Sequence, residues 1–300
     1  MTWINSFYRD PNAVAYATQL FSGIKTPSVT THSPYQTSSA DTQDTQNTAG
    51  QRALAKIIEI LSLGDGSTTT QANVSESIGN ITGANGTDGS DTLTLTGRTI
   101  YNVETSGGDD SVIAKSAAIA GVALGDDKDS LKASASLISD IDGGAGNDDI
   151  QLTGSLIMNV TGGTGDDTIK ASGHSLIGID GGDGNDTMYL EGNRIFASGD
   201  KGNDTVTIHQ TGGNNSIAEY AFTAGDGQDT VSTDGPLSLR PSGYKEGDLS
   251  ITTTKNSLTI TMKGSDDRIT VSLAGSKQSG NATPTYQFAS DNGQLILKIS

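Results

Sequence analysis

Residues 143–190 read GGAGNDDIQLTGSLIMNVTGGTGDDTIKASGHSLIGIDGGDGNDTMYL. The unit Gly-Gly-x-Gly-x-Asp occurs three times in this segment, and its closing residues Asp148, Asp167 and Asp186 are 19 residues apart. A regular interval of this size is typical of a repeat architecture, in which each repeat packs only against its neighbours. The same column continues at intervals of 19 residues before Asp148, and of 18 and then 25 residues after Asp186, through Asp91, Asp110, Asp129, Asp204 and Asp229.

Apolar side chains follow the same period. They stand two, four, nine and twelve residues after the repeated aspartates, and the first two columns alternate with mostly polar residues. Alternation with a period of two indicates β-strands, whereas an amphipathic helix has a period near 3.6 residues. We therefore predict an all-β fold, a parallel β-solenoid (β-roll or β-helix) of about seven or eight 19-residue turns stacked about 4.8 Å apart. The column nine residues after the aspartates reads Ile100, Ile119, Ile138, Ile157, Leu176 and Ile195.

The composition agrees with a thin core. Of the 300 residues, 33% are apolar and 5% aromatic, whereas 39 are glycine and none is cysteine. Such a chain cannot fill a thick globular core, but it can fill one that is a single side chain deep and repeated along an axis. The formal net charge of −17 argues against nucleic acid and anionic membranes as partners, since both select basic surfaces. The absence of cysteine excludes disulfides and thiolate metal sites.

Four segments are expected along the chain. Residues 1–50 form an N-terminal segment with a Ser/Thr-rich linker, and residues 51–79 a capping helix and lead-in, with Leu54, Ile57, Ile58 and Leu61 on one helical face. Residues 80–232 form the solenoid, and residues 233–300 a small C-terminal β cap with turns at 255–256 and 264–267. The N-terminus lacks the pattern of a cleaved signal peptide, and no run approaches the roughly 20 apolar residues of a membrane helix.

The loops rich in glycine and aspartate predict metal sites. Calcium takes about six to eight oxygen ligands, many of them backbone carbonyls, and glycine permits the left-handed turns that aim carbonyl oxygens inward. Stacking brings the carbonyls of one loop beside the aspartate of the next, so we expect several calcium ions in one row and no other cofactor. The expected ligands are Asp148, Asp167, Asp186 and Asp204 with Gly144, Gly146, Gly163, Gly165, Gly182, Gly184 and Gly202, and outside these four loops Asp91, Asp110, Asp129 and Asp229.

Electrostatic repulsion makes a cation in this row a strong requirement. Two carboxylates about 4.8 Å apart repel by roughly 3.5 kcal/mol at an effective dielectric near 20, and several such pairs would exceed the stability of a domain. A divalent ion between them reverses the sign, so we expect calcium binding and folding to be coupled. In the degenerate loop 124–129, Lys128 would replace a cation. Asp142 and Asp180, just before two loops, are either extra ligands or solvated turn residues.

The loop segments GGDGNDTMY (181–189), GGAGNDDIQ and GGTGDDTIK resemble the nonapeptide of the RTX (repeats-in-toxin) calcium-binding family. This resemblance implies a parallel β-roll that folds on calcium and export by a type I secretion system of a Gram-negative bacterium, with an uncleaved C-terminal signal. Only one half-turn carries the nonapeptide here, which is similar to the one-sided, 19-residue calcium solenoid of a bacterial ice-binding adhesin. Residues 220–296 resemble the haemolysin-type calcium-binding related region, while residues 1–79 resemble no family.

The sequence leaves three functions open. The first is a secreted or cell-surface protein with a structural, adhesion or interaction role, toward a glycan or another surface target. The second is a polysaccharide-active enzyme, a lyase or epimerase, but the outward positions Lys132, Gln151, Lys170 and Tyr189 contain no acid–base pair, so no catalytic residue is predicted. The third is ice binding, which needs a regular Thr/Asn array, whereas the third loop position varies from turn to turn.

Overall fold

The computed structural model describes residues 70–273, 283–291 and 293–300. The predicted N-terminal segment 1–50 and the predicted capping helix lie outside these residues. The structure is 71% strand and 3% helix, which confirms the predicted all-β class. Its elements are β1 (Thr70–Asn85), β2 (Asp91–Glu104), β3 (Ser111–Lys115), β4 (Ala118–Asp126), β5 (Ser130–Ser134), β6 (Leu137–Ala145), β7 (Asp149–Thr164), β8 (Thr168–Asp183), β9 (Thr187–Gly192), β10 (Arg194–Ser198), β11 (Thr205–Gln210), η1 (Gly213–Asn215), β12 (Ile217–Thr223), β13 (Gln228–Thr233), β14 (Leu237–Ser242), η2 (Glu246–Asp248), β15 (Leu249–Thr254), β16 (Ser257–Met262), β17 (Arg268–Leu273), β18 (Tyr286–Asp291) and β19 (Gln294–Ile299).

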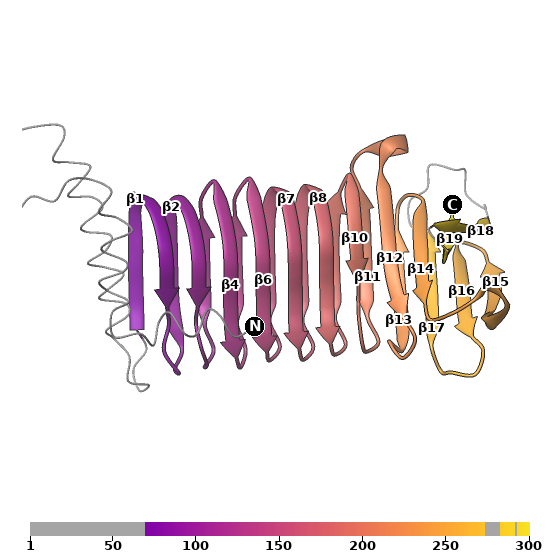
Figure 1. Cartoon of the computed structure of the whole chain (residues 1–300), viewed down its shortest axis with the longest axis horizontal. Coiled ribbons are helices and arrows are strands. Elements are labelled where there is room, and N and C mark those ends of the chain that lie inside the picture. The colour runs from indigo at the N-terminus through magenta and orange to yellow at the C-terminus, as the bar shows by residue number, and fades with distance from the viewer. Residues whose placement is uncertain (1–69, 274–282, 292) are drawn as a thin grey trace, which may run out of the picture. The chain divides into compact units, whose positions relative to one another are not determined.

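The strands coil into a parallel β-solenoid of about nine turns (Figure 1). Residues 19 apart in the sequence are direct neighbours, as where Ile150 of β7 pairs with Ile169 of β8. In β7 and β8 the pairing continues through the corner between the two predicted strands of a turn, at Gly154 and Gly173. The apolar period of the sequence is therefore the length of one complete coil, as predicted.

The core is a set of apolar ladders between the two strand layers. The ladder from Ile100 to Ile195 has six members, and each of them is 0% exposed. Burial of one such aliphatic side chain stabilises a fold by about 1.5–3 kcal/mol. Because each member stacks on the equivalent side chain of the next turn, the apolar contacts run without a break along the solenoid.

The predicted count of seven or eight turns is too low. An additional strand, β1, pairs in parallel with β2 and places Ile81 beside Ile100, with a bulge between Val74 and Ile78. The paired ladder thus begins at Thr70 rather than at residue 80. Thr70 is the residue that pairs with Asp91, so the column of repeated aspartates has no member in β1, and a count based on those aspartates therefore missed this turn.

The 25-residue interval before Asp229 contains the expected insertion. It forms the short helix η1 at one corner, after which β12 returns to the ladder and Ile217 pairs with Arg194 of β10. In the same turn Tyr220 and Phe222 point inward and are fully buried, as their alternation predicted. The insertion therefore changes one corner and leaves the stack continuous.

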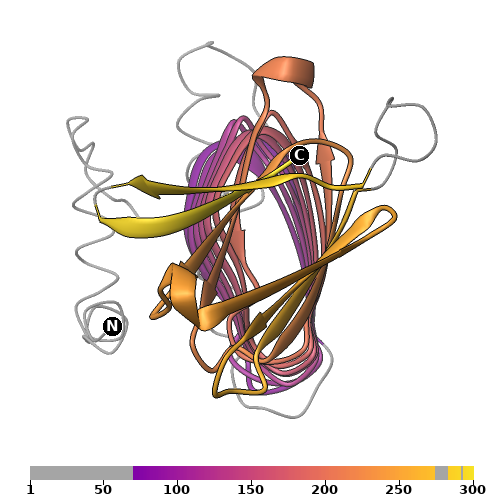
Figure 2. The same ribbon diagram turned by 90° about the vertical axis from the view of Figure 1, so that its right-hand side faces the viewer.

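The C-terminal strands change from parallel to antiparallel pairing. β17 continues one layer by pairing in parallel with β13, and β16 and β15 then follow in antiparallel order. β19 pairs antiparallel with β14 of the other layer, and β18 pairs with β19. Figure 2 shows the coils superimposed behind these last strands. This arrangement confirms the predicted C-terminal β cap and its two turns.

Candidate metal centre

The repeated aspartates form one buried column along the solenoid. Each stands at the end of a loop, just before or at the start of the strand that follows, and the 19-residue register places it beside the aspartate of the next turn. Their exposed fractions lie between 1% and 4% for all eight members: Asp91, Asp110, Asp129, Asp148, Asp167, Asp186, Asp204 and Asp229. Eight carboxyl groups are thus withdrawn from solvent in a chain that has a large negative charge.

One oxygen of each carboxylate is used to join the turns. The amide N–H of Asp148 donates to Asp167 Oδ1 at 2.7 Å, and the amide N–H of Asp167 donates to Asp186 Oδ1 at 2.7 Å. The same bond occurs at every step from Asp91 to Asp229, with lengths up to 3.1 Å. Oδ1 therefore has a structural role that needs no metal.

The second oxygen is left without a partner in most of the column. In six turns Oδ2 is buried and accepts no hydrogen bond: Asp110, Asp129, Asp148, Asp167, Asp186 and Asp204. A buried polar atom without a partner costs about 1–3 kcal/mol, and more when it is charged. Each of these oxygens therefore needs either a proton or a cation.

Carbonyl oxygens converge on these carboxylates from the neighbouring turn. A methyl group placed on Gly162, the first residue of its loop, would overlap both Asp167 Oδ2 and the carbonyl oxygen of Gly181. A methyl group on Gly143 would lie 2.7 Å from Asp148 Oδ2 and would overlap the carbonyl oxygen of Gly162. Carboxylate and carbonyl oxygens are the ligands that calcium prefers, so the residues present fit this ion.

The carboxylate count in each turn is low for a metal site. No group of three or more His, Asp or Glu side chains suited to a metal ion occurs among the described residues. An ion in this column would therefore take most of its ligands from the backbone of two adjacent loops, which is how calcium sites in glycine-rich loops reach their coordination number.

Burial raises the pKa values of the aspartates in the column. The pKa of Asp167 rises to about 7, first because burial removes water from the charged form and then because Asp148 and Asp186 are charged neighbours. Burial likewise raises the pKa of Asp129 to about 7 and that of Asp204 above its ordinary value. In the absence of a cation, these carboxyls are therefore partly protonated near neutral pH.

The loop glycines adopt the predicted left-handed backbone. Gly163 has φ +110°, and a Cβ there would overlap the carbonyl oxygen of Gly144 in the preceding turn. Only glycine permits this close stacking of loops. The other glycines predicted in the loops also have positive φ: Gly144, Gly146, Gly165, Gly182, Gly184 and Gly202.

The less certain sequence candidates lie in different surroundings. Lys128 is exposed, and its amide N–H donates to Asp109 Oδ1 at 3.2 Å. Its side chain therefore does not take the buried place of a cation, and that expectation is wrong. Asp142 and Asp180 are half-buried, and burial raises the pKa of Asp180, whose Oδ1 is buried without a partner.

A second ladder, on the outside of the loops, was not predicted. The side-chain oxygen of Asn147 accepts the amide N–H of Asp166 at 3.0 Å, and Asp166 Oδ1 accepts that of Asn185 at 2.7 Å. In the same way, Asn185 Oδ1 accepts the amide N–H of Asn203, and Asn203 Oδ1 accepts that of Gln228. The sequence signal was the Asn or Asp that precedes five of the eight buried aspartates: Asp109, Asn147, Asp166, Asn185 and Asn203. This ladder joins the loops on their exposed side.

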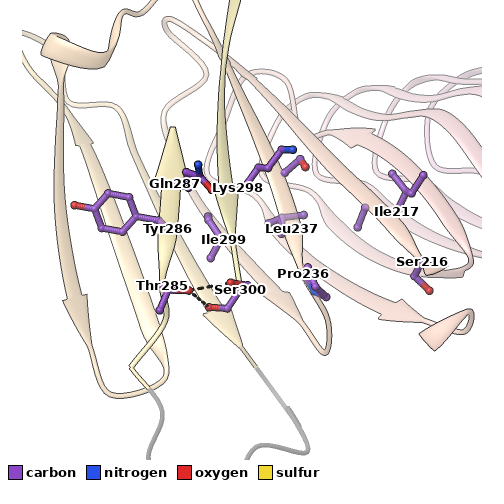
Figure 3. A pocket seen from close by; sticks show the side chains of 12 residues that line it. Ser216, Ile217, Pro236, Leu237, Thr285, Tyr286, Gln287, Lys298, Ile299 and Ser300 are labelled. Carbon is purple, nitrogen blue, oxygen red and sulfur yellow. Dashed lines mark hydrogen bonds between the residues drawn. The ribbon is translucent and has the colours of Figure 1, made fainter. Parts of the chain in front are cut away.

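Two hollows lie away from the column. One of about 330 Å³ is lined by Lys170, Tyr189, Glu191 and His209, and His209 Nδ1 contacts Asp234 Oδ2. This pair was not predicted, although its two residues are separated by the same 25 positions as Asp204 and Asp229. The other, of about 540 Å³, lies where β12 and β14 meet β18 and β19 (Figure 3). Of the described residues that line it, Lys298 is the one with a charge.

No protein-family model matches the chain, and a search of curated proteins found no match. The described part of the chain has no helix that is long and apolar enough to span a membrane. The functional argument therefore depends on the geometry of the aspartate column and on the loop sequences.

Proposed function

We propose that this chain is a secreted or cell-surface calcium-binding protein of the RTX type, whose solenoid folds on calcium and serves a structural, adhesion or interaction role. The observation that supports it best is the column of buried Oδ2 atoms without hydrogen-bond partners, of which those of Asp148, Asp167 and Asp186 face the same space as a carbonyl oxygen of the next turn. Asp148, Asp167, Asp186 and Asp204 would hold the ions together with loop carbonyls. Bound calcium supplies the positive charge that the column lacks.

Calcium suits the donor set better than other common ions. The converging atoms are carboxylate and carbonyl oxygens, whereas zinc in proteins is bound mostly by Cys and His. Magnesium demands near-octahedral geometry and keeps several of its waters, which fits poorly with a narrow buried column. Sites of moderate affinity, about 10⁻⁴–10⁻³ M, occur in extracellular modules. With such an affinity, the chain would stay unfolded in a low-calcium cytosol. It would pass through a type I secretion channel in that state and fold outside, where calcium is abundant.

A calcium titration followed by circular dichroism tests the proposal. We expect the β signal and the melting temperature of the purified full chain to rise with calcium and to fall on addition of chelator. Magnesium at equal concentration is the control and should produce a much smaller change. Equal melting temperatures in chelator and in millimolar calcium, with no ion retained in native mass spectrometry, would contradict calcium binding.

A polysaccharide-active protein is the second candidate. The hollow around Tyr189 favours it, since this ring is 49% exposed and lies beside the pair of His209 and Asp234. An exposed aromatic ring suits stacking on a sugar, and an imidazole held by a carboxylate suits proton transfer. Incubation with polyuronates and neutral polysaccharides, assayed for reducing ends and unsaturated products, tests this reading. Product formed by wild type and lost in His209→Ala would favour the enzyme over a binding role.

A further inference from the structure

The first position of each Gly/Asp loop, five residues before the aspartate, holds two kinds of residue. Two of the early turns have a side chain there, Thr105 and Leu124. The strand register places these two positions in one column with the later ones, since Gly125 pairs with Gly144. The four turns that follow have glycine: Gly143, Gly162, Gly181 and Gly199. The end loops have Gly86, where a Cβ would lie 2.6 Å from the Thr105 carbonyl oxygen and 2.8 Å from Asp91 Oδ2, and Ala224.

Glycine at these four positions reflects a need for space. None of the four lies in the left-handed region, so the backbone alone would permit another residue. A side chain on Gly162 would instead overlap Asp167 Oδ2 and the Gly181 carbonyl oxygen. At Gly143, Gly162 and Gly181 the place that a side chain would take is thus where a carboxylate and a carbonyl oxygen converge, whereas at Gly199 it lies between the Asp204 carboxylate and the Tyr220 hydroxyl. A side chain and a cation would compete for this place.

In the two early turns the same backbone position carries a buried side chain. Thr105 and Leu124 are both 0% exposed. The Thr105 hydroxyl donates to the Leu124 carbonyl oxygen, the counterpart of the Gly181 carbonyl, and the Leu124 side chain belongs to the apolar core. Asp110 and Asp129 of these turns still have a buried Oδ2 without a partner. What differs between the two sets of turns is thus the space beside the carboxylate.

Hydrogen bonds occupy the carboxylates at both ends of the column. Asp91 Oδ2 accepts the amide N–H of Thr87 at 2.6 Å and its hydroxyl at 3.0 Å. Asp229 Oδ2 accepts the hydroxyl of Tyr220 at 2.6 Å. Both oxygens therefore have donors from the protein itself and need no cation.

We infer that Thr105 and Leu124 close their turns to calcium, so that the row of ions is confined to the four turns of Asp148, Asp167, Asp186 and Asp204. This inference rests on the proposed calcium binding. The early turns then stack without metal, through their apolar ladders and amide bonds, whereas the following turns depend on the ion. The solenoid is thereby divided into a metal-independent part and a calcium-dependent part that folds against it.

The number of bound ions tests the division. Native mass spectrometry of the full chain in calcium should find four ions in wild type. Thr105→Gly opens the place beside Asp110 and should bind one more ion, whereas its matched control Thr105→Val keeps the place filled and should bind the wild-type number. Gly162→Thr introduces the early-turn residue beside Asp167 and should bind one ion fewer, with the circular dichroism of the β-sheet retained in calcium.

The outcomes separate this inference from the proposal on which it depends. A folded Thr105→Gly with the wild-type number of ions, or a folded Gly162→Thr that loses none, overturns the division of the row. If the variants fail to fold, the wild-type count decides, since five or six ions would mean that one or both of the early turns are open. A wild-type chain that retains no calcium refutes the proposed function itself.

Discussion

Replacement of Asp167 by asparagine should affect the metal-free and the calcium-bound protein in opposite directions. Asp167 Oδ1 accepts the amide N–H of Asp148 at 2.7 Å, and an amide oxygen would keep that bond. The amide nitrogen would stand where Oδ2 stands, beside the Gly181 carbonyl oxygen, to which it would donate. We expect Asp167→Asn to be more stable than wild type without calcium and to bind calcium more weakly.

The expected size of the effect follows from the burial of this carboxyl. Burial raises the pKa of Asp167 from 3.8 to about 7, which corresponds to about 4 kcal/mol against the charged form above that pH. A neutral amide avoids this cost but is itself desolvated, so we expect a gain of about 1–4 kcal/mol in the metal-free free energy of unfolding near pH 8. Loss of an anionic ligand should raise the calcium midpoint at least about tenfold.

Urea unfolding followed by circular dichroism over a descending calcium series, with the free energy of unfolding extrapolated to zero calcium because wild type folds on the ion, measures both effects. Asp166→Asn is the matched control, because it makes the same change in net charge one residue away at an exposed position. Its amide can still accept the Asn185 N–H that Asp166 accepts at 2.7 Å. If Asp167→Asn loses stability in metal-free buffer and has the calcium midpoint of the control, Oδ2 is not the metal-facing atom.

Three further predictions concern the same column. Because the pKa of Asp167 is raised, the folded state holds more protons than the unfolded state between about pH 4 and 7. The metal-free free energy of unfolding should therefore fall as pH rises, by up to about 1.4 kcal/mol per pH unit for each such group. Urea titrations at several pH values measure this change, and a rise in the free energy of unfolding with pH contradicts the prediction. Tyr220→Phe leaves Asp229 Oδ2 without its donor and should cost about 1–3 kcal/mol in urea unfolding in saturating calcium, and unchanged stability would refute the role of the hydroxyl. Gly163→Ala strains a residue at φ +110° against the Gly144 carbonyl oxygen and should cost about 2–4 kcal/mol, measured likewise, with no loss as the contrary outcome.

Much of the fold follows from spacing alone. The interval from Asp148 to Asp167 equals the length of one coil, and Ile157 stacks on Leu176 as the interval requires. Side-chain direction alternates along a strand because of the pleat of the backbone, so the inward and outward positions of each turn could be assigned without coordinates. The left-handed loop glycines followed in the same way, since only such turns aim carbonyls at the aspartates.

The candidate site was predicted in outline only. The eight aspartates do form one column, and the loop sequences already separate four of them from the rest, but only the structure shows that Oδ2 of Asp91 and of Asp229 accepts a hydrogen bond. The alternation of polar and apolar residues predicted Tyr220 as a core residue, but it did not predict that the Tyr220 hydroxyl donates to Asp229 Oδ2. Lys128 has the right charge to replace a cation and is nevertheless exposed. These outcomes depend on contacts between residues about one turn or less apart that no local pattern encodes.

The amino-acid sequence by itself determined the repeat length, the inward columns and the loops in which oxygen ligands gather, because these depend on periodicity along a single chain. Tertiary structure alone decided that β1 adds a turn, that Asp91 Oδ2 and Asp229 Oδ2 receive hydrogen bonds, and that Thr105 and Leu124 are fully buried at the position that glycine holds in the following turns. The physical reason is that an empty or filled volume beside a buried carboxylate is a property of stacked neighbours. It exists only once the turns are in register.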